Sequence, residues 1–426
     1  MPKASLAENF TPNQRAVVLL VAAVQFINIL DFVMVMPLGP YFAQVGVAQS
    51  QMGLVGAAYT ASACISGLVS ASFLDRFDRR KVLAVAMVGL VVGTAAGGVA
   101  QGMTTLLLAR SLAGAFGGPA TAIAFSIIAD TIPVSLRGRA IGMVMGAFSA
   151  ATVFGVPAGL WMAEHLGWRS SFFAVSALGV FVVVGAIALL PPLTGHLEAF
   201  KNETHHITTR ELLARPLVQV SLAMTALTMM AGFVLIPNIA TFLHLNHGVE
   251  MSGLKFLYLI GGVGSLIASQ TTGRLVDRFS AFKVGTVGTL LVGLVIFLVF
   301  VDNNRLHLPV PIFFVWFMVA MAARNVPYNT LTTRVPGPTE RARFQSIQSA
   351  VQHGASAFAA GMSPLLLSLT PREPWPTDMP GELPRLLTGM DHVALISLGL
   401  TLTIPFLLWW VEHRVSPKAA PLLPTR

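Results

Sequence analysis

Apolar residues dominate the chain in a series of long runs, which short polar segments separate. A helix needs about 20 mostly apolar residues to cross the roughly 30 Å hydrocarbon core of a bilayer. A segment inside lipid must also satisfy its own backbone hydrogen bonds, which a helix does. The pattern therefore predicts an all-α membrane protein with twelve transmembrane helices. The runs lie at about residues 16–38, 52–74, 82–101, 104–128, 141–163, 171–191, 217–243, 252–271, 282–301, 309–330, 345–369 and 391–411.

The composition supports this fold class and argues against others. Of the 426 residues, 54% are hydrophobic and 11% are charged, whereas soluble domains carry about 25% charged residues. The pI of about 10.3 is high enough for a nucleic-acid-binding protein. However, the basic residues lie in short loops rather than on one soluble domain. We therefore expect a lipid bilayer around the protein and no nucleic acid as a partner.

Lysine and arginine concentrate in every second loop, which is the pattern that sets membrane orientation. The opposite loops hold only Arg169, Arg305, Arg372 and Arg385. This asymmetry predicts that both termini are cytoplasmic, which requires an even number of spans. Short loops and termini favour a bacterial inner membrane. The basic residues of the predicted cytoplasmic loops are Lys3, Arg15, Arg76, Arg79, Arg80, Lys81, Arg137, Arg139, Lys201, Arg210, Arg215, Arg274, Arg278, Lys283, Arg334, Arg341, Arg343, Arg414, Lys418 and Arg426.

Features of the first half of the sequence recur in the second half. Residues 73–82 (FLDRFDRRKV) are similar to residues 273–284 (GRLVDRFSAFKV). We therefore expect two pseudo-symmetric six-helix bundles, at residues 1–193 and 217–426, which a cytoplasmic linker at 194–216 joins. Paired halves with a binding site near the bilayer midplane are typical of secondary transporters.

Asp31 is the one acidic residue that lies well inside an apolar run. A carboxylate at that depth costs about 2.5–3.5 kcal/mol on insertion scales, and such residues usually serve function. We expect Asp31 to bind a proton or a cationic substrate. Gln25 and Asn28 share its arc of the helix, and we expect this polar arc to face a central cavity. The alternative is a structural aspartate that is hydrogen-bonded to a neighbouring helix.

The second half carries no carboxylate at the corresponding position. Phe32 corresponds to Phe233, which puts Ala231 or Gly232 at the position of Asp31. Any proton coupling is therefore expected in the first half.

Several motifs resemble those of the major facilitator superfamily and, within it, of the 12-span drug:proton antiporter family. The resemblance covers nearly the whole chain. Residues 71–80 (ASFLDRFDRR) are similar to the superfamily's loop between its second and third helices, G-x-L-a-D-R-x-G-R-R, although Ala71 and Asp78 replace its two glycines. Further similar motifs are Leu107-Leu108-Ala109-Arg110 with Gly114, Gly155-Val156-Pro157-Ala158-Gly159, and Gly167-Trp168-Arg169 with Phe172.

The resemblance implies a role for Arg110 in proton coupling, through contact with the run at 16–38. The alternative is a structural pin in which Arg110 binds backbone carbonyl groups of neighbouring helices. A pin that also influences the protonation of Asp31 would satisfy both interpretations.

The resemblance also implies a gating network at the cytoplasmic side, which holds the outward-facing state closed there. A plain positive-inside anchor is the alternative. The motif Gly155, Pro157 and Gly159 would let its helix bend and pack closely, because small residues permit near contact and proline removes a hydrogen bond. The expected gating residues are Asp75, Arg76, Arg79, Arg80, Asp130, Asp277 and Arg278.

Polar residues also gather in the runs at 309–330 and 345–369. They favour a cavity that holds a polar or anionic group, with ordinary interhelical hydrogen bonding as the alternative. Arg324 in particular would repel a cationic drug. The residues expected to line this cavity are Arg324, Asn325, Gln345, Gln348, Gln352 and His353.

The remaining motifs give no sign of an enzyme. The single cysteine, Cys64, excludes internal disulfides and a cysteine-rich metal site. His205 and His206 have no further ligands near them in the sequence, and no phosphate-binding glycine-rich loop with a following lysine is present. We therefore expect no cofactor, no metal and no catalytic triad.

These observations predict a secondary active transporter that works by alternating access. The preferred function is proton-coupled efflux of a drug-like or other small organic molecule, with Asp31 as the proton site. An exporter or uptake symporter of a polar metabolite, such as a sugar or an amino acid, is the first alternative. A non-transporting membrane receptor on the same scaffold is the second. A monomer is expected.

Overall fold

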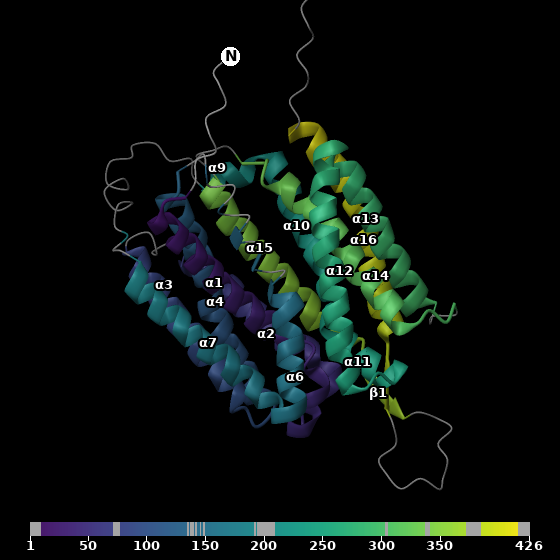
Figure 1. The fold of residues 1–426 in the computed structure, drawn as a ribbon. Helices are drawn as coiled ribbons and strands as arrows, with labels where there is room; N and C mark the ends of the chain where they lie inside the picture. Colours follow the sequence, from purple (N-terminus) through teal and green to yellow (C-terminus); the bar gives the residue numbers. More distant parts are fainter. Residues whose placement is uncertain are drawn as a thin grey trace, which may run out of the picture.

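The computed structural model describes residues 10–70, 77–133, 150–190, 209–302, 306–336, 341–371 and 385–415, with a few further positions between 136 and 193. Long helices make up most of it, and they run roughly side by side (Figure 1). The helices longer than one turn are α1 (Pro12–Val35), α2 (Met52–Ser70), α3 (Arg79–Gly98), α4 (Met103–Thr131), α6 (Val156–Leu166), α7 (Trp168–Leu189), α9 (Thr209–Ala214), α10 (Pro216–Phe233), α11 (Ile236–His247), α12 (Met251–Arg278), α13 (Ala281–Ile296), α14 (Val310–Thr332), α15 (Arg341–Met362) and α16 (Met390–Val415).

Short elements adjoin several of these helices. Two π-helical turns lie in line with α6 and α13, and three 3-10 turns follow α1 and α15. They are η1 (Gly39–Val45), η2 (Gln49–Gln51), η4 (Ala151–Gly155), η5 (Phe297–Val301) and η6 (Ser363–Leu365).

One part of the structure corrects the all-α prediction. Strand β1 (Ser368–Pro371) pairs antiparallel with β2 (Arg385–Thr388), between α15 and α16. The apolar run at 345–369 therefore does not form one helix, since α15 ends at Met362 and its last residues belong to η6 and β1. The side of the molecule that carries this hairpin is called the hairpin side below. The opposite side, where α1 begins and α16 ends, is called the terminal side (Figure 1).

Ten helices in the described part of the chain are long and apolar enough to cross a membrane. Two of the twelve predicted runs are not among them. The run at 141–163 is described only in part, as η4 and the short helix α6. The run at 345–369 forms α15, which is long enough but carries several glutamine and arginine residues. The run at 217–243 is divided at Val234 and Leu235, shortly before Pro237, into α10 and α11.

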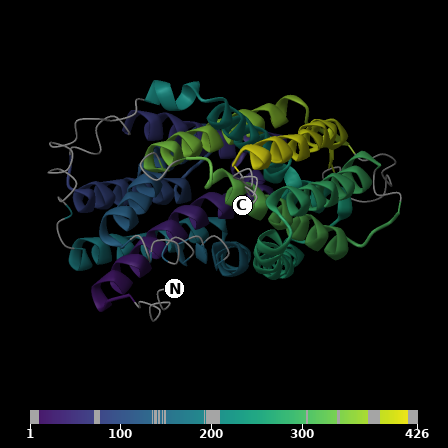
Figure 2. The ribbon, with the colours of Figure 1, turned by 90° about the horizontal axis from the view of Figure 1, so that it is seen from above.

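Helices of each sequence half pack mainly on one another. In the first half, α4 packs on α1, α2 and α3, while α7 packs on α1 and α3; in the second half, α14 packs on α12 and α13, while α16 packs on α10 and α13. The view from above shows the two sets of helices beside each other (Figure 2).

The main contacts between the two sequence halves involve small residues. Helix α15 lies along α2, α12 packs on η4 and α6, and α11 packs on η1. A Cβ atom added at Gly53 of α2 would lie only 2.0 Å from the carbonyl oxygen of Ala360 of α15. A Cβ added at Gly262 of α12 would lie 3.2 Å from the carbonyl oxygen of Thr152. Glycine therefore permits backbone contact between the halves, as is common between helices in membranes.

Candidate functional site

A buried ion pair joins α1 to α4. The guanidinium of Arg110 donates from Nη1 to Oδ1 of Asp31 at 2.8 Å and from Nη2 to Oδ2 at 3.0 Å. Nη2 also donates to the backbone oxygen of Asp31 at 3.2 Å. Asp31 is 0% exposed and Arg110 is 1% exposed. Two parallel charge-assisted hydrogen bonds are the strongest way for arginine to hold a carboxylate.

Helices α2 and α3 complete the surroundings of this pair. Thr94 of α3 donates its hydroxyl to Oδ1 of Asp31 at 2.8 Å. The ring of Tyr59 of α2 lies under the Arg110 guanidinium, with 4.8 Å between Cζ and the ring centroid, which is within cation–π range. The carboxylate therefore binds groups from two helices besides its own.

Asn28 forms a second polar contact one turn before Asp31. It accepts a hydrogen bond from the Tyr59 hydroxyl at 2.5 Å. Its amide donates to the backbone oxygen of Gly117 and to Oγ1 of Thr121, both at 2.7 Å. Tyr59 thus contacts both Arg110 and Asn28, so that α1, α2 and α4 share one hydrogen-bonded network.

Glycine lets α2 approach α4 closely enough for this network. A Cβ added at Gly114 would lie 2.1 Å from the backbone oxygen of Tyr59, and one added at Gly117 would lie 2.3 Å from the Tyr59 hydroxyl. The two positions allow no larger residue without movement of α2.

The polar arc of α1 does not face open space in this structure, contrary to the expectation from its sequence. Gln25, Asn28 and Asp31 are 7%, 5% and 0% exposed. Asn28 and Asp31 are turned into the interfaces with α2, α3 and α4, because their hydrogen-bond partners lie there. Oε1 of Gln25 has no hydrogen-bond partner.

Sequence reasoning singled out Asp31, Arg110 and Asn28 but missed Thr94 and Tyr59. Both missed residues lie in apolar runs, where a lone hydroxyl is common and carries little signal. The glycine at every fourth position of α3, Gly89, Gly93 and Gly97, marked that helix as closely packed but did not identify Thr94 as a partner of Asp31.

A second polar cluster, called the tyrosine cluster below, surrounds Tyr328 between α10, α14 and α15. Tyr328 of α14 accepts hydrogen bonds from the amides of Gln348 at 3.4 Å and Gln352 at 3.2 Å. Gln348 donates in addition to Oγ1 of Thr332 at 3.2 Å. The structure therefore brings together Gln348 and Gln352, which the sequence placed on one helix face.

The other residues predicted to line this cavity do not all lie next to Tyr328. Arg324 is buried one helical turn before Tyr328, and its Nε lies 3.4 Å from Oδ1 of Asn325. Gln345 is exposed near the start of α15, and His353 is half-buried. Gln345 and His353 therefore lie at the edge of the cluster or outside it.

Several of the residues predicted to form a gate make contacts at the terminal side. Nε of Arg79, at the start of α3, lies 2.5 Å from Oδ2 of Asp130, at the end of α4. Arg80 donates to the backbone oxygen of Ile187. Arg278 lies over the ring of Phe279, with 5.3 Å between Cζ and the centroid.

The structure does not describe the side chains of the other expected gating residues. Asp75 and Arg76 lie outside the described residues, and Asp277 is described only by its backbone. Asp78 replaces a glycine of the superfamily motif and caps α3, since its carboxylate accepts from the backbone nitrogens of Arg80 and Leu193, each at 3.0 Å.

The motif with Gly155, Pro157 and Gly159 adjoins α1. Residues 151–155 form a π-helical turn just before α6. Pro157, in the first turn of α6, lacks the backbone N–H that a regular helix would use. A Cβ added at Gly155 would lie 2.4 Å from Leu30 Cδ1, and one at Gly159 would lie 2.9 Å from Met34 Cγ. The two glycines therefore let α1 pack closely on η4 and α6. Their contacts, Leu30 and Met34, lie on either side of Asp31 in the sequence.

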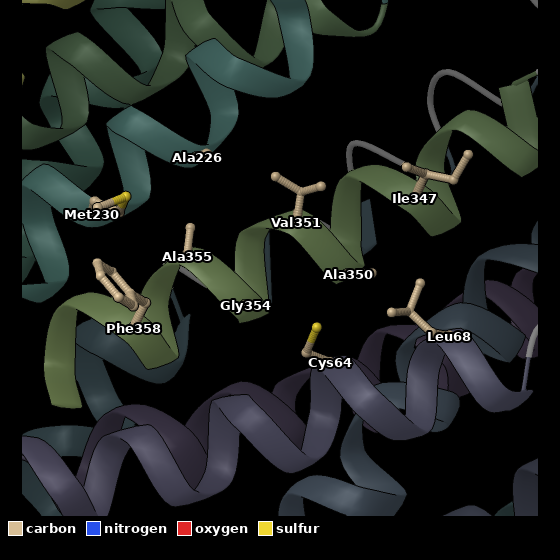
Figure 3. A pocket seen from close by; sticks show the side chains of 10 residues that line it. All are labelled: Cys64, Leu68, Ala226, Met230, Ile347, Ala350, Val351, Gly354, Ala355 and Phe358. Atoms are coloured by element: carbon tan, nitrogen blue, oxygen red, sulfur yellow. The ribbon is translucent and has the colours of Figure 1, made fainter. Parts of the chain in front are cut away.

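An apolar pocket of about 460 Å³ lies between α2, α10 and α15 (Figure 3). Its walls offer shape and hydrophobic contact but almost no hydrogen-bonding groups. No group of three metal-binding side chains occurs among the residues that the structure describes. The pocket is lined by Cys64, Leu68, Ala226, Met230, Ile347, Ala350, Val351, Gly354, Ala355 and Phe358.

Several known transporters are similar to the chain in sequence. The purine ribonucleoside efflux pump NepI of Salmonella paratyphi A is 26% identical over 356 residues, which are 82% of this chain and 86% of the pump. The match to NepI of Escherichia coli, also at 26%, spans 66% of that pump, just under two thirds of its length. The uncharacterized MFS-type transporter YfhI of Bacillus subtilis is 27% identical over 57% of this chain and 61% of its own.

Solved structures are similar in fold. A D-xylose-proton symporter gives a TM-score of 0.73 at 15% identity and covers 95% of this chain and 99% of its own. The nucleoside transporter NupG gives a TM-score of 0.65 at 13% identity and covers 93% of this chain and 99% of its own.

The family model for the Major Facilitator Superfamily matches residues 21–360, which include the ion pair, the tyrosine cluster and the apolar pocket. The helical fold and its ten candidate spans agree with this match. The chain therefore belongs to the Major Facilitator Superfamily and is a multi-pass membrane transporter rather than an enzyme.

Proposed function

We propose that the protein exports a small polar organic molecule in exchange for protons, by alternating access. The observation that carries this proposal is the buried, bidentate ion pair between Asp31 and Arg110. Relatives described as purine ribonucleoside efflux pumps favour export, and they favour a substrate that bears hydroxyl groups and ring nitrogens.

Protonation of Asp31 would act directly on the packing of α1 against α4. A neutral carboxyl group leaves the Arg110 guanidinium buried without its counter-charge, and breaking such a pair costs about 3–5 kcal/mol. Reversing a two-state equilibrium from 1:99 to 99:1 takes about 5.5 kcal/mol. One proton at Asp31 therefore supplies most of the free energy needed to favour a second arrangement of these helices.

The proposed topology has twelve spans in two six-helix bundles, at residues 1–193 and 217–426, with the linker at 194–216. It adds α15 and the helix that ends with α6 to the ten candidate spans. Both termini and the terminal side face the cytoplasm, the membrane is a bacterial inner membrane, and the protein acts as a monomer. The alternating excess of basic residues in the loops supports this orientation.

Contacts between the halves support an inward-facing conformation in this topology. Lys255 of α12 binds Glu164 of α6 at 2.5 Å, and Asn238 of α11 donates to Ser363 at 3.0 Å. Helices α6 and α11 lie near β1 (Figure 1), and α11 packs on β2. Gly53 lies at the start of α2, which contacts η6 just before β1. The hairpin side is then the closed, external side.

The Arg79–Asp130 pair fits a gate at the cytoplasmic side. It ties the start of α3 to the end of α4 within the first half. In the proposed cycle, these residues meet the start of α15 when the cytoplasmic side closes. Movement of α4, which also carries Arg110, then links the gate to the protonation of Asp31.

Transport by inverted membrane vesicles would test the proposed function. With an acid interior, vesicles that contain the wild type should accumulate a labelled purine ribonucleoside, and vesicles with Asp31→Asn should accumulate less than about a tenth as much. Vesicles without the protein give the background. Equal accumulation by wild type and Asp31→Asn would remove Asp31 from the mechanism.

Efflux of lipophilic drugs is a second candidate, which the apolar pocket between α2, α10 and α15 favours. Cells that lack their own pumps would be exposed to a panel of lipophilic cations. Lower accumulation with the wild type than with Asp31→Asn would support this candidate, whereas equal accumulation across the panel would exclude it.

A further inference from the structure

The second half of the molecule buries an arginine that no described carboxylate neutralises. Arg324 of α14 is 1% exposed. Its two hydrogen bonds are long, at 3.4 Å from Nε to Oδ1 of Asn325 and 3.4 Å from Nη2 to the backbone oxygen of Thr228. Nη1 has no hydrogen-bond partner. Good N–H···O bonds measure about 2.7–3.2 Å, so the guanidinium retains unused binding capacity.

Two further side chains retain hydrogen-bonding capacity: Thr228, whose backbone oxygen accepts from Arg324, and Gln348, which contacts Tyr328 one turn along α14. Oγ1 of Thr228 and Oε1 of Gln348 are buried without a partner. Gln348 also donates to Tyr328, whose hydroxyl binds Gln352 as well. Buried polar atoms are nearly always hydrogen-bonded in folded proteins. The unpaired atoms of Arg324 and Thr228, with that of Gln348 in the adjoining cluster, therefore point to a group that the chain does not itself supply.

The backbone beside Arg324 leaves the position of a carboxylate open. A Cβ added at Gly232 of α10 would lie 3.6 Å from Nη2 of Arg324, and its nearest neighbours would be the terminal methyl carbons of Met321 at 3.3 Å and Ile236 at 3.4 Å. Both neighbours are ends of flexible side chains. An aspartate at this position could therefore reach the guanidinium.

The internal repeat relates Gly232 to the position of Asp31 in the first half. Gly232 is one of the two residues that correspond to Asp31, because Phe233 corresponds to Phe32. The first half thus supplies its own carboxylate to its buried arginine, whereas the second half offers a buried arginine and a glycine.

We propose that Arg324 binds an anionic group of the transported molecule, a carboxylate or a phosphate, between α14 and the Gly232 turn of α10. The planar guanidinium can hold either group through two parallel hydrogen bonds. Thr228 and the tyrosine cluster would bind neighbouring hydroxyl or amide groups. This inference rests on the proposed transport function and adds the charge of the substrate to it.

Filling the site from within the chain gives a first test that needs no ligand. The melting temperature of purified full-length Gly232→Asp would be compared with that of Gly232→Asn, which has the same shape without the charge. The aspartate variant should melt higher, and the difference should disappear when Arg324→Gln is added. Equal melting temperatures for the two variants in the presence of Arg324 would overturn the proposal.

Binding of matched probes gives the second test and separates the two kinds of anion. Calorimetry would compare adenosine with adenosine monophosphate and with its carboxylic-acid analogue, using wild-type protein in detergent. At least one anionic probe should bind tenfold more tightly than adenosine, and Arg324→Gln should abolish that difference. The proposal is overturned if neither anion binds tenfold more tightly than adenosine. The stronger of the two anions identifies the preferred group.

The Asp31→Asn variant distinguishes failure of this inference from failure of the proposed function. Calorimetry uses no proton gradient, so this variant should keep the tenfold preference for the anion even where it has lost pH-driven transport. A preference that disappears in Asp31→Asn would assign the anion to the first half and contradict the role of Arg324.

Discussion

The two halves of the molecule treat a buried arginine in opposite ways. Arg110 is held by two short hydrogen bonds to Asp31, with Thr94 as a further partner of the carboxylate. Arg324 is equally buried but makes two bonds of 3.4 Å, neither of them to a carboxylate. A repeated scaffold can therefore place a closed ion pair in one half and an incomplete site in the other. The closed ion pair is suited to control by protonation of Asp31. The incomplete site is suited to a ligand that neutralises Arg324.

Neutralising each arginine should produce the largest contrast in stability. Arg110→Gln leaves the Asp31 carboxylate buried without its partner, and we expect the free energy of unfolding to fall by about 3–5 kcal/mol. Arg324→Gln removes a charge that no described carboxylate balances, so the free energy should stay unchanged or rise. Denaturant unfolding in detergent measures both.

The double variant Asp31→Asn with Arg110→Gln is the control for this contrast. It should recover part of the stability lost in Arg110→Gln, because no buried charge remains at that place. Equal losses for the two single arginine variants would contradict the difference between the halves.

Enlarging the glycines that bring helices together should have the next largest effect. Gly114→Ala forces a methyl group against the backbone of Tyr59, and Gly288→Ala forces one to within 2.7 Å of the backbone nitrogen of Arg324. Overpacking of this kind costs about 1–3 kcal/mol, and thermal unfolding measures it. Gly399→Ala meets no atom within 4 Å and should be neutral or slightly stabilising. Loss of stability in all three variants would reject close approach as the cause.

Asp130→Asn should have a smaller effect, on rate rather than on folding. The substitution removes the carboxylate that binds Arg79. This Arg79–Asp130 pair lies at the terminal side, away from the Asp31–Arg110 pair. We expect turnover to fall several-fold while the affinity for substrate stays the same, as initial rates of vesicle transport would show. Normal turnover in Asp130→Asn would favour a simple membrane anchor.

Glu164→Gln should have the smallest effect. The Glu164–Lys255 pair is partly exposed, and such pairs contribute about 0.2–1 kcal/mol. The ratio of the two conformations should therefore change by no more than about fivefold, towards opening at the hairpin side. Distances between spin labels on α6 and α12 report this ratio, and Glu250→Gln on the same side serves as the control. A complete shift would show that the pair contributes more free energy to the closed conformation than its partial exposure predicts.

Much of the helical order and the main ion pair could be predicted from the sequence. Hydropathy identified the helices because lipid requires long apolar segments. Asp31 was recognisable because a carboxylate is costly at that depth, and Arg110 because its motif resembles that of a known family. The break between α10 and α11 and the β1–β2 hairpin were not predicted, since a proline within an apolar run and a short polar loop are compatible with several conformations.

The direction of the side chains was harder to predict than the residues themselves. Gln25, Asn28 and Asp31 were assigned to one arc by helical spacing, but spacing alone does not say whether an arc faces a cavity or another helix. The contacts of Tyr59 with Asn28 and Arg110 require Gly114 and Gly117, which let α2 lie close to α4. That contact joins residues far apart in the sequence, so a local pattern could not reveal it.

The polarity of α15 has a consequence for the biogenesis of the protein. It is long enough to cross a bilayer, but it does not qualify by composition among the ten apolar helices. In the proposed topology, a segment with this many amide and charged groups gains little by entering lipid alone. Its insertion during synthesis must therefore depend on helices already in place, and α2 and α10, which it contacts in the finished structure, are made before it. The translocation machinery would have to retain these earlier helices until α15 emerges from the ribosome.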